Sequence, residues 1–406
     1  MKSSAVTPTT TYWQPVLAMA LMQGAIILCW IVYRLYIPDL LGQFGFPKSS
    51  AVIILAIEGF LAVLIEPLFG SLSDRQRTLW GLRAPFTTLG VLLASALLLV
   101  LPSVVLLGDP ESALRWLFIA LVILWSMAMA MFRSPMLARL GEFACQRDWP
   151  YAASVLTLVG TIAATLALPA SKEVVKGLGP GPAFAISSII LLISATLLNW
   201  TQPAQTHLPE LISDQQQPSA QNLCLVALTG STITLAVILT QQLIGLVDKT
   251  QAPLLLTFFL VVQLITVLPI GWLAQRWGSL QTMIVGLVLL GLGFSTLIVP
   301  VPLIRSLAIL FLGIGMGGVG VATIPFALYM VPLSRGGLGI GCYFGGAALA
   351  GAFFNVYMSR AIQLPLVPGW IVGLFSMMGA IAILWMCRTR IHPPPRGISS
   401  FQELPN

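Results

Sequence analysis

Apolar stretches of similar length alternate with short polar breaks along almost the whole chain. A transmembrane helix needs roughly 20 predominantly apolar residues, and twelve windows of about this size occur. They cover residues 13–36, 50–72, 85–107, 114–132, 150–170, 181–200, 222–246, 252–274, 281–300, 304–330, 337–358 and 368–387. The pattern predicts an all-α polytopic membrane protein with twelve transmembrane helices.

One longer polar stretch divides this series into two equal parts. Residues 201–221 are rich in Gln and Pro and follow the sixth window. We expect a six-helix bundle over 1–200, a cytoplasmic linker over 201–221, a second six-helix bundle over 222–387 and a polar tail over 388–406. Residues 1–12 lack a charged segment followed by a cleavage site, so the first window is expected to remain as a span.

The composition excludes several classes of protein. Of the 406 residues, 57% are hydrophobic and 8% charged, against about a quarter charged in soluble domains, so the lipid bilayer is the expected solvent. The net charge of +7 is dispersed between apolar blocks, which does not indicate a nucleic-acid surface. The five cysteines show no metal-like or redox-like spacing. We expect no metal site, no cofactor and, because hydrolase and ATP-binding motifs are missing, no enzyme.

The distribution of positive charge predicts the orientation. Lys and Arg resist translocation and gather in cytoplasmic loops. With both termini inside, the cytoplasmic loops of this chain carry more Lys and Arg than the outer loops, although the linker carries none. We therefore expect a monomer in the inner or plasma membrane, with both termini cytoplasmic.

Two short patterns recur in both halves of the chain. The stretch 70–75, Gly-Ser-Leu-Ser-Asp-Arg, has a counterpart 201 residues later in 271–276, Gly-Trp-Leu-Ala-Gln-Arg. A second echo relates 133–138 to 324–328, each with a proline near its start. Such repeats are typical of transporters built from two similar halves around a central cavity.

The loop after the second window predicts a gate. Glycine allows two helices to approach closely, an aspartate can cap a neighbouring helix, and arginines hold a loop at the cytoplasmic face. The predicted cytoplasmic gate consists of Gly70, Asp74, Arg75, Arg83, Gly271 and Arg276. The alternative is an ordinary positively charged loop with a helix breaker.

These stretches resemble a known family of proteins. Gly70, Asp74 and Arg75 fit the Gly-x-x-x-Asp-Arg loop of the major facilitator superfamily. The longer segments 66–86 and 324–355 are similar to the glycoside-pentoside-hexuronide cation symporters and the sucrose transporters. The resemblance implies alternating access of a sugar-like solute, coupled to H⁺ or Na⁺.

Two acidic residues lie deep within a span, and both are in the second window. A charge at the bilayer centre costs roughly 2.5–3.5 kcal/mol on insertion scales. In the symporters that this window resembles, the acidic residue before the proline helps to bind the coupling cation, and Glu66 holds that position. Ala62 replaces the partner carboxylate, and a single carboxylate is a poor Na⁺ cage, so we favour H⁺.

Glu58 lies two helical turns before Glu66 and is a candidate second binding position for the coupling ion. At about 100° and 1.5 Å per residue, the two side chains differ by about 80° around the helix and about 12 Å along it, too far apart to share one ligand. The alternative is that both carboxylates pair with Arg34 or Arg133 and only lock the bundle.

Five residues are candidates for binding the solute: Gln23, Trp30, Tyr33, Arg34 and Arg133. An arginine can clamp a carboxylate or a pair of hydroxyl groups, and an aromatic ring can stack on a sugar. Gln23 falls where the resembled family has an acidic sugar-contacting residue. Interfacial anchoring of the aromatic residues and snorkelling of Arg34 are the alternatives.

The favoured function is a secondary active transporter of a small solute, most simply a sugar or glycoside, coupled to H⁺. The alternative is a non-transporting assembly factor or pigment (chlorophyll) delivery factor on the same scaffold. An exporter of drugs or organic anions is a third hypothesis.

Overall fold

The computed structural model describes Pro8 and residues 10–47, 49–80, 84–107, 113–202, 217–247, 249–360 and 365–390. Within these ranges, twelve helices are long and apolar enough to cross a membrane, which confirms the predicted fold class. They are α1 (Trp13–Gln43), α2 (Ser49–Trp80), α3 (Ala84–Leu107), α4 (Leu114–Ala138), α6 (Trp149–Ala164), which spans Gln146–Ala167 together with its flanking 3₁₀ turns, α8 (Pro180–Trp200), α9 (Ala220–Val247), α10 (Ala252–Trp277), α11 (Ser279–Thr296), α12 (Pro302–Tyr329), α13 (Gly336–Arg360) and α14 (Leu366–Cys387).

Several helices are longer than the apolar windows. The windows end at 36 and 72, whereas α1 continues to Gln43 and α2 to Trp80. Hydropathy measures only the part of a helix that lipid surrounds, while the hydrogen-bonded backbone continues into the polar boundary.

Short elements connect the long helices. They are α5 (Leu140–Phe143), α7 (Pro169–Gly177) and the 3₁₀ turns η1 (Gln146–Asp148), η2 (Thr165–Ala167) and η4 (Leu333–Arg335). The predicted linker and tail lie largely outside the described residues, since 203–216 and 391–406 are not among them.

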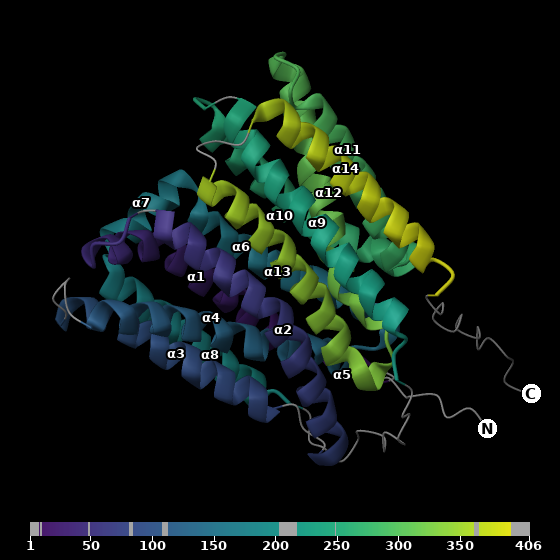
Figure 1. The fold of residues 1–406 in the computed structure, drawn as a ribbon. Coiled ribbons are helices and arrows are strands. Elements are labelled where there is room, and N and C mark those ends of the chain that lie inside the picture. The colour runs from purple at the N-terminus through teal and green to yellow at the C-terminus, as the bar shows by residue number, and fades with distance from the viewer. Residues whose placement is uncertain are drawn as a thin grey trace, which may run out of the picture.

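The helices pack as two groups (Figure 1). In the first half, α1 lies against α6 and α8, and α3 lies against α4 and α8; in the second, α9 lies against α13 and α14, and α11 against α12. Between the halves, α2 packs along α13, and α6 packs along α10. The two halves therefore meet along two helix pairs, α2 with α13 and α6 with α10.

Small residues allow α2 and α13 to approach closely. A Cβ atom added at Gly341 would overlap the backbone carbonyl of Glu66, and one at Gly345 would lie 3.1 Å from the carbonyl oxygen of Val63. Gly337, Gly341 and Gly345 recur every fourth residue and so share one face of α13. This is the small-residue spacing that brings membrane helices into backbone contact.

One end of the bundle, here called the terminal end, contains the first turns of α1 and α9 and the last turn of α14. The backbone N–H of Tyr12 donates to the carbonyl of Phe143 at 2.8 Å. The amide of Asn222 donates to the carbonyl of Met330 at 3.1 Å, and Arg390 donates to Asn222 at 3.1 Å. The ends of α4 and α12 therefore lie at this same end.

Prolines interrupt corresponding helices of the two halves. Pro67 in α2 and Pro269 in α10 are 202 positions apart, and Pro135 in α4 and Pro325 in α12 are 190 apart. Proline cannot donate the backbone hydrogen bond of a helix interior and favours a kink. The sequence repeats thus correspond to equivalent points of the two bundles.

Candidate functional site

A cavity of about 410 Å³ lies between the two halves. Its walls come from α1, α2 and α4 of the first half and from α9 and α13 of the second. The polar side chains that line it are Arg34, Glu58, Glu66, Ser126, Arg133, Thr234, Gln241 and Asn355. Both predicted coupling carboxylates and both predicted arginines therefore face one space.

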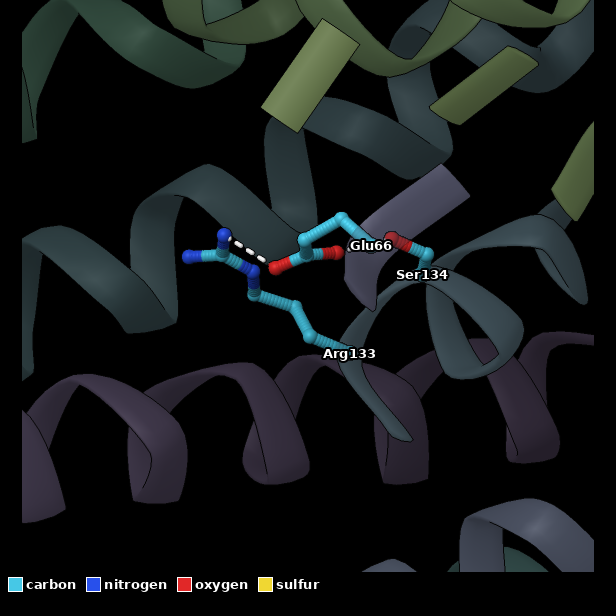
Figure 2. Close-up of polar contacts among 3 residues, drawn as sticks. All are labelled: Glu66, Arg133 and Ser134. Carbon is cyan, nitrogen blue, oxygen red and sulfur yellow. Dashed lines mark hydrogen bonds and ion pairs between the residues drawn. The ribbon is translucent and has the colours of Figure 1, made fainter. Parts of the chain in front are cut away.

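Glu66 forms the most fully partnered polar cluster in this cavity (Figure 2). Its side chain is 0% exposed; one carboxylate oxygen accepts from Arg133 Nη2 in an ion pair, and the other accepts from the hydroxyl of Ser134. The Arg133 guanidinium also lies 4.4 Å from the ring centre of Phe344 on α13. The cluster thus links α2 and α4 to the opposite half of the molecule.

Glu58 has a different environment, although it lies on the same helix. It is 4% exposed and accepts a hydrogen bond from the Tyr33 hydroxyl, while its Oε2 atom is buried without a partner among the described residues. Tyr33 is itself buried and stacks on Trp125 with 4.2 Å between ring centres. Tyr33 is therefore placed behind Glu58, and only the latter is part of the cavity wall.

Arg34 and Trp30 line the cavity from α1. The Arg34 guanidinium carbon lies 5.6 Å from the centre of the Trp30 ring, and Trp30 packs edge-on against Tyr33 and Trp125. Arg34 is exposed although it lies nine residues before the end of the helix. The cavity, rather than a helix end, gives this side chain its exposure.

Gln23 lies apart from these residues. It faces α6, where its Cγ atom is 3.8 Å from the position a Cβ would occupy at Gly160, and it is not among the residues that line the cavity. Its Oε1 atom is buried without a partner among the described residues. Of the five predicted solute-binding residues, the structure brings Trp30, Arg34 and Arg133 to the cavity.

Asp74 joins α2 to the start of α13 at the terminal end. The carboxylate is 1% exposed, and its two oxygens accept from the backbone N–H groups of Gly337 and Leu338 at 2.9 and 2.8 Å. A Cβ atom at Gly70 would overlap the carbonyl of Gly337. Asp74 therefore caps a helix of the other half, where the positive end of the helix dipole favours a carboxylate.

The second copy of the pattern makes a related contact between α10 and α6. A Cβ atom at Gly271 would overlap the side chain of Ser154, and Gln275 Nε2 donates to Asp148 Oδ1 at 3.0 Å. Close by, Tyr329 donates to the carbonyl of Gln146 at 3.1 Å and packs on Trp149. Both copies thus close the terminal end.

The predicted gate arginines occupy different places. Arg75 is exposed, and Arg276 lies over the ring of Trp272 with 3.8 Å between the guanidinium carbon and the ring centre. Arg83 lies outside the described residues.

Sequence reasoning did not assign Ser134, Gly337, Leu338 or Asp148 to the site. Ser134 directly follows Arg133 in one of the repeated patterns, and Gly337 belongs to the four-residue glycine spacing of α13. These signals indicate close helix packing, but they do not identify the partner helix.

Comparisons with known proteins identify the fold. Residues 220–405 match the family model described as Major Facilitator Superfamily. The chain superposes on the crystal structure of the human organic anion transporter MFSD10 (TETRAN) with a TM-score of 0.69 and 14% identity, over 93% of this chain and 99% of that one. FucP, a transporter of the superfamily in its outward conformation, gives 0.69 and 11%, over 92% and 99%.

The sequence relatives match a shorter region. A membrane-associated transporter protein of Homo sapiens is 32% identical over 93 residues, which are 22% of this chain and 18% of the relative. That of Mus musculus is 36% identical over 93 residues, with the same coverage. The chain thus shares its fold with these transporters and matches the superfamily model over its second half, while the narrower resemblance to the glycoside-pentoside-hexuronide and sucrose branch is not confirmed.

Proposed function

We propose that this multi-pass membrane protein, which has the major facilitator fold, is a secondary active transporter of a small polar solute, with a sugar or glycoside as the first class to test. One observation carries the proposal: a cavity between the two halves holds a buried carboxylate, Glu66, whose partner Arg133 also contacts the opposite half. A site shared by both halves can be exposed to each side of the membrane in turn.

The proposed coupling ion is H⁺. Both oxygens of Glu66 already accept hydrogen bonds, from Arg133 and Ser134, and Ala62 lines the cavity one turn earlier. Sodium would need several oxygen ligands and the removal of Arg133. A proton on Glu66 needs no further ligands; it would remove the charge that holds Arg133 and so weaken the contact of α4 with α2.

The proposed mechanism is a rocking of one half against the other. The contacts of Asp74 and Gln275 close the terminal end in this state, so the solute would enter from the opposite end. If the terminal end is cytoplasmic, as the charge distribution predicts, the structure corresponds to an outward-facing state of a monomeric transporter. Release of solute inside would require both contacts to break.

The test is transport in vesicles that contain the purified protein. We expect counterflow of at least one solute from a panel of sugars and glycosides, together with alkalinisation outside the vesicles as solute and H⁺ enter. Glu66→Gln should keep counterflow and lose accumulation driven by a pH gradient, because the glutamine cannot take up a proton. Glu173→Gln, which changes an exposed carboxylate on α7, is the matched control.

Two results would overturn the proposal. Unchanged gradient-driven accumulation in Glu66→Gln would remove Glu66 from coupling. A protein that moves no solute and purifies with bound pigment, or in fixed proportion with a pigment-protein complex, would favour the delivery-factor alternative.

A further inference from the structure

Two arginines line the cavity, and of the two only Arg133 forms an ion pair among the described residues. Arg133 forms its ion pair with Glu66. Arg34 also lines the cavity, but among the described residues it has no carboxylate within 4.0 Å, and its contact is with the face of Trp30. The two guanidinium groups therefore differ in whether an acidic side chain of the described residues pairs with them directly.

Glu58 attracts Arg34 electrostatically but forms no ion pair with it within 4.0 Å. Its carboxyl group is turned to the Tyr33 hydroxyl, which donates to Oε1, and Tyr33 is fixed in turn by stacking on Trp125. An arginine within the depth of a membrane protein is costly, and such residues normally face a cavity and pair with a ligand or an acidic side chain. Arg34 faces the cavity, and the group that pairs with it would be supplied by a ligand.

The rest of the cavity wall is largely apolar and carries four uncharged polar side chains. Thr234 and Gln241 come from α9, Asn355 comes from α13, and Ser126 comes from α4. Hydroxyl and amide groups of this kind exchange hydrogen bonds with the hydroxyl groups of a ligand. A volume of about 410 Å³ lies in the range of roughly 300–1,000 Å³ that is usual for small-molecule sites.

We infer that Arg34 is an anion-binding residue, and that the solute of the proposed transporter is a hydroxylated carboxylic acid whose carboxylate lies on the Arg34 guanidinium while its hydroxyl groups face Thr234, Gln241 and Asn355. This inference rests on the proposed function, because it assigns the cavity to a transported solute. The planar fork of arginine pairs with a carboxylate through two parallel hydrogen bonds. Arg34 thus supplies the charge recognition, and the opposite half supplies the recognition of the hydroxylated body.

Equilibrium binding to the purified full-length protein in lipid nanodiscs tests the inference. The probes are gluconate and sorbitol, which have the same hydroxylated chain and differ in whether one end is a carboxylate or an alcohol. We expect gluconate to raise the thermal unfolding temperature in a saturable manner and sorbitol at equal concentration to leave it unchanged. Arg34→Gln should weaken gluconate binding about tenfold or more, and Arg34→Lys should fall between the two.

The matched control is Arg115→Gln. Arg115 also lies over aromatic rings, at 5.0 Å from Phe46 and 5.1 Å from Trp116, but it is not part of the cavity wall. This variant should bind gluconate like the unmodified protein, which separates loss of the site from general loss of an arginine that packs on an aromatic ring.

Failure of the inference and failure of the proposed function give different results. Equal binding of sorbitol and gluconate, no gluconate binding by the unmodified protein, or gluconate binding that Arg34→Gln leaves unchanged would overturn the inference. If vesicles still show sugar counterflow in that case, the transport proposal stands. Gluconate binding that depends on Arg34, without counterflow of gluconate or of any other solute, would support the site and overturn transport.

Discussion

The two copies of the repeated loop close the same end of the molecule by different chemistry. At the α2–α13 contact, the buried carboxylate of Asp74 accepts two backbone N–H groups from the start of a helix. At the α10–α6 contact, the half-buried amide of Gln275 donates one hydrogen bond to the side chain of Asp148. In the first contact the charged side chain, Asp74, lies on the helix that carries the glycine. In the second contact the charged side chain, Asp148, lies on the facing segment.

The two contacts also differ in what each glycine packs against. Gly70 faces the backbone of Gly337, whereas Gly271 faces the side chain of Ser154. Backbone cannot retreat without moving a helix, but a serine side chain can be shortened. The first contact therefore permits little change, and the second can be adjusted one side chain at a time.

The largest predicted effect comes from filling the two glycine positions. Gly70→Ala should destabilise the closed terminal end by roughly 1–3 kcal/mol, because overpacking forces backbone shifts. Gly271→Ala should have a similar effect that Ser154→Gly relieves, since its clash is with the Ser154 side chain. The measurement is the alkylation rate of Ala62→Cys in the cavity by an impermeant reagent added at the terminal end, with the five native cysteines replaced.

This comparison has a clear contrary result. Rescue should be confined to the second contact, so Gly70→Ala combined with Ser154→Gly should remain as reactive as Gly70→Ala alone. If Ser154→Gly fails to slow alkylation in the Gly271→Ala background, the assignment of that clash to the serine is wrong.

A smaller effect is expected from removing the charge of Asp74. Asp74→Asn keeps the shape of the side chain but replaces one charged acceptor with a donor that faces backbone N–H, which should cost about 1–2 kcal/mol of closed-state stability. The same alkylation rate should rise about fivefold to thirtyfold. Asp74→Glu is the control that keeps the negative charge on a longer side chain. An alkylation rate unchanged by Asp74→Asn would exclude capping as the role of this residue.

Gln275→Glu tests the α10–α6 contact by introducing a second negative charge. The new carboxylate would face Asp148 across a distance now bridged at 3.0 Å by a hydrogen bond, and like charges at such a distance repel. We expect faster alkylation at low salt and partial recovery at high salt, because the pair is only half-buried and salt screens it. An effect that does not depend on salt would contradict an electrostatic origin.

The smallest effect is predicted for Gln275→Ala. Loss of one neutral donor to a partly exposed carboxylate should cost about 0.5–1.5 kcal/mol, and Asp148 keeps the 2.6 Å hydrogen bond from Thr11. The alkylation rate should rise less than in Asp74→Asn. If the order of these two variants is reversed, the α10–α6 contact is the stronger latch.

The sequence was sufficient to predict the membrane-spanning helices, because their apolar length is a local property. It also placed Glu58 and Glu66 on one helix, and both face the same cavity. The helix ends were less predictable: α2 continues to Trp80 through polar residues that no hydropathy window includes. Residues 169–177 form α7 between two spans, and this element was not predicted.

The partners of the site residues depend on three-dimensional packing and could not be predicted in the same way. Arg133 was one of two possible partners for a buried carboxylate, and only the approach of α4 to α2 selects it for Glu66. Likewise, the repeat at 70–75 predicts a capping aspartate, but the capped N–H groups belong to Gly337, 263 residues along the chain. Gln23 shows the reverse case, since its place in a motif did not bring it to the cavity.

Pro67, the residue after Glu66, gives α2 a mechanical property. Because proline has no N–H, the carbonyl of Val63 lacks its usual donor within the helix. One backbone hydrogen bond of α2 is therefore missing beside the Glu66–Arg133 ion pair. Bending stiffness is therefore lowest where the charge cluster holds the helix against α4. A single chemical event at Glu66 can act on the softest point of α2, so a local change in charge becomes a change in the angle between the two ends of one helix.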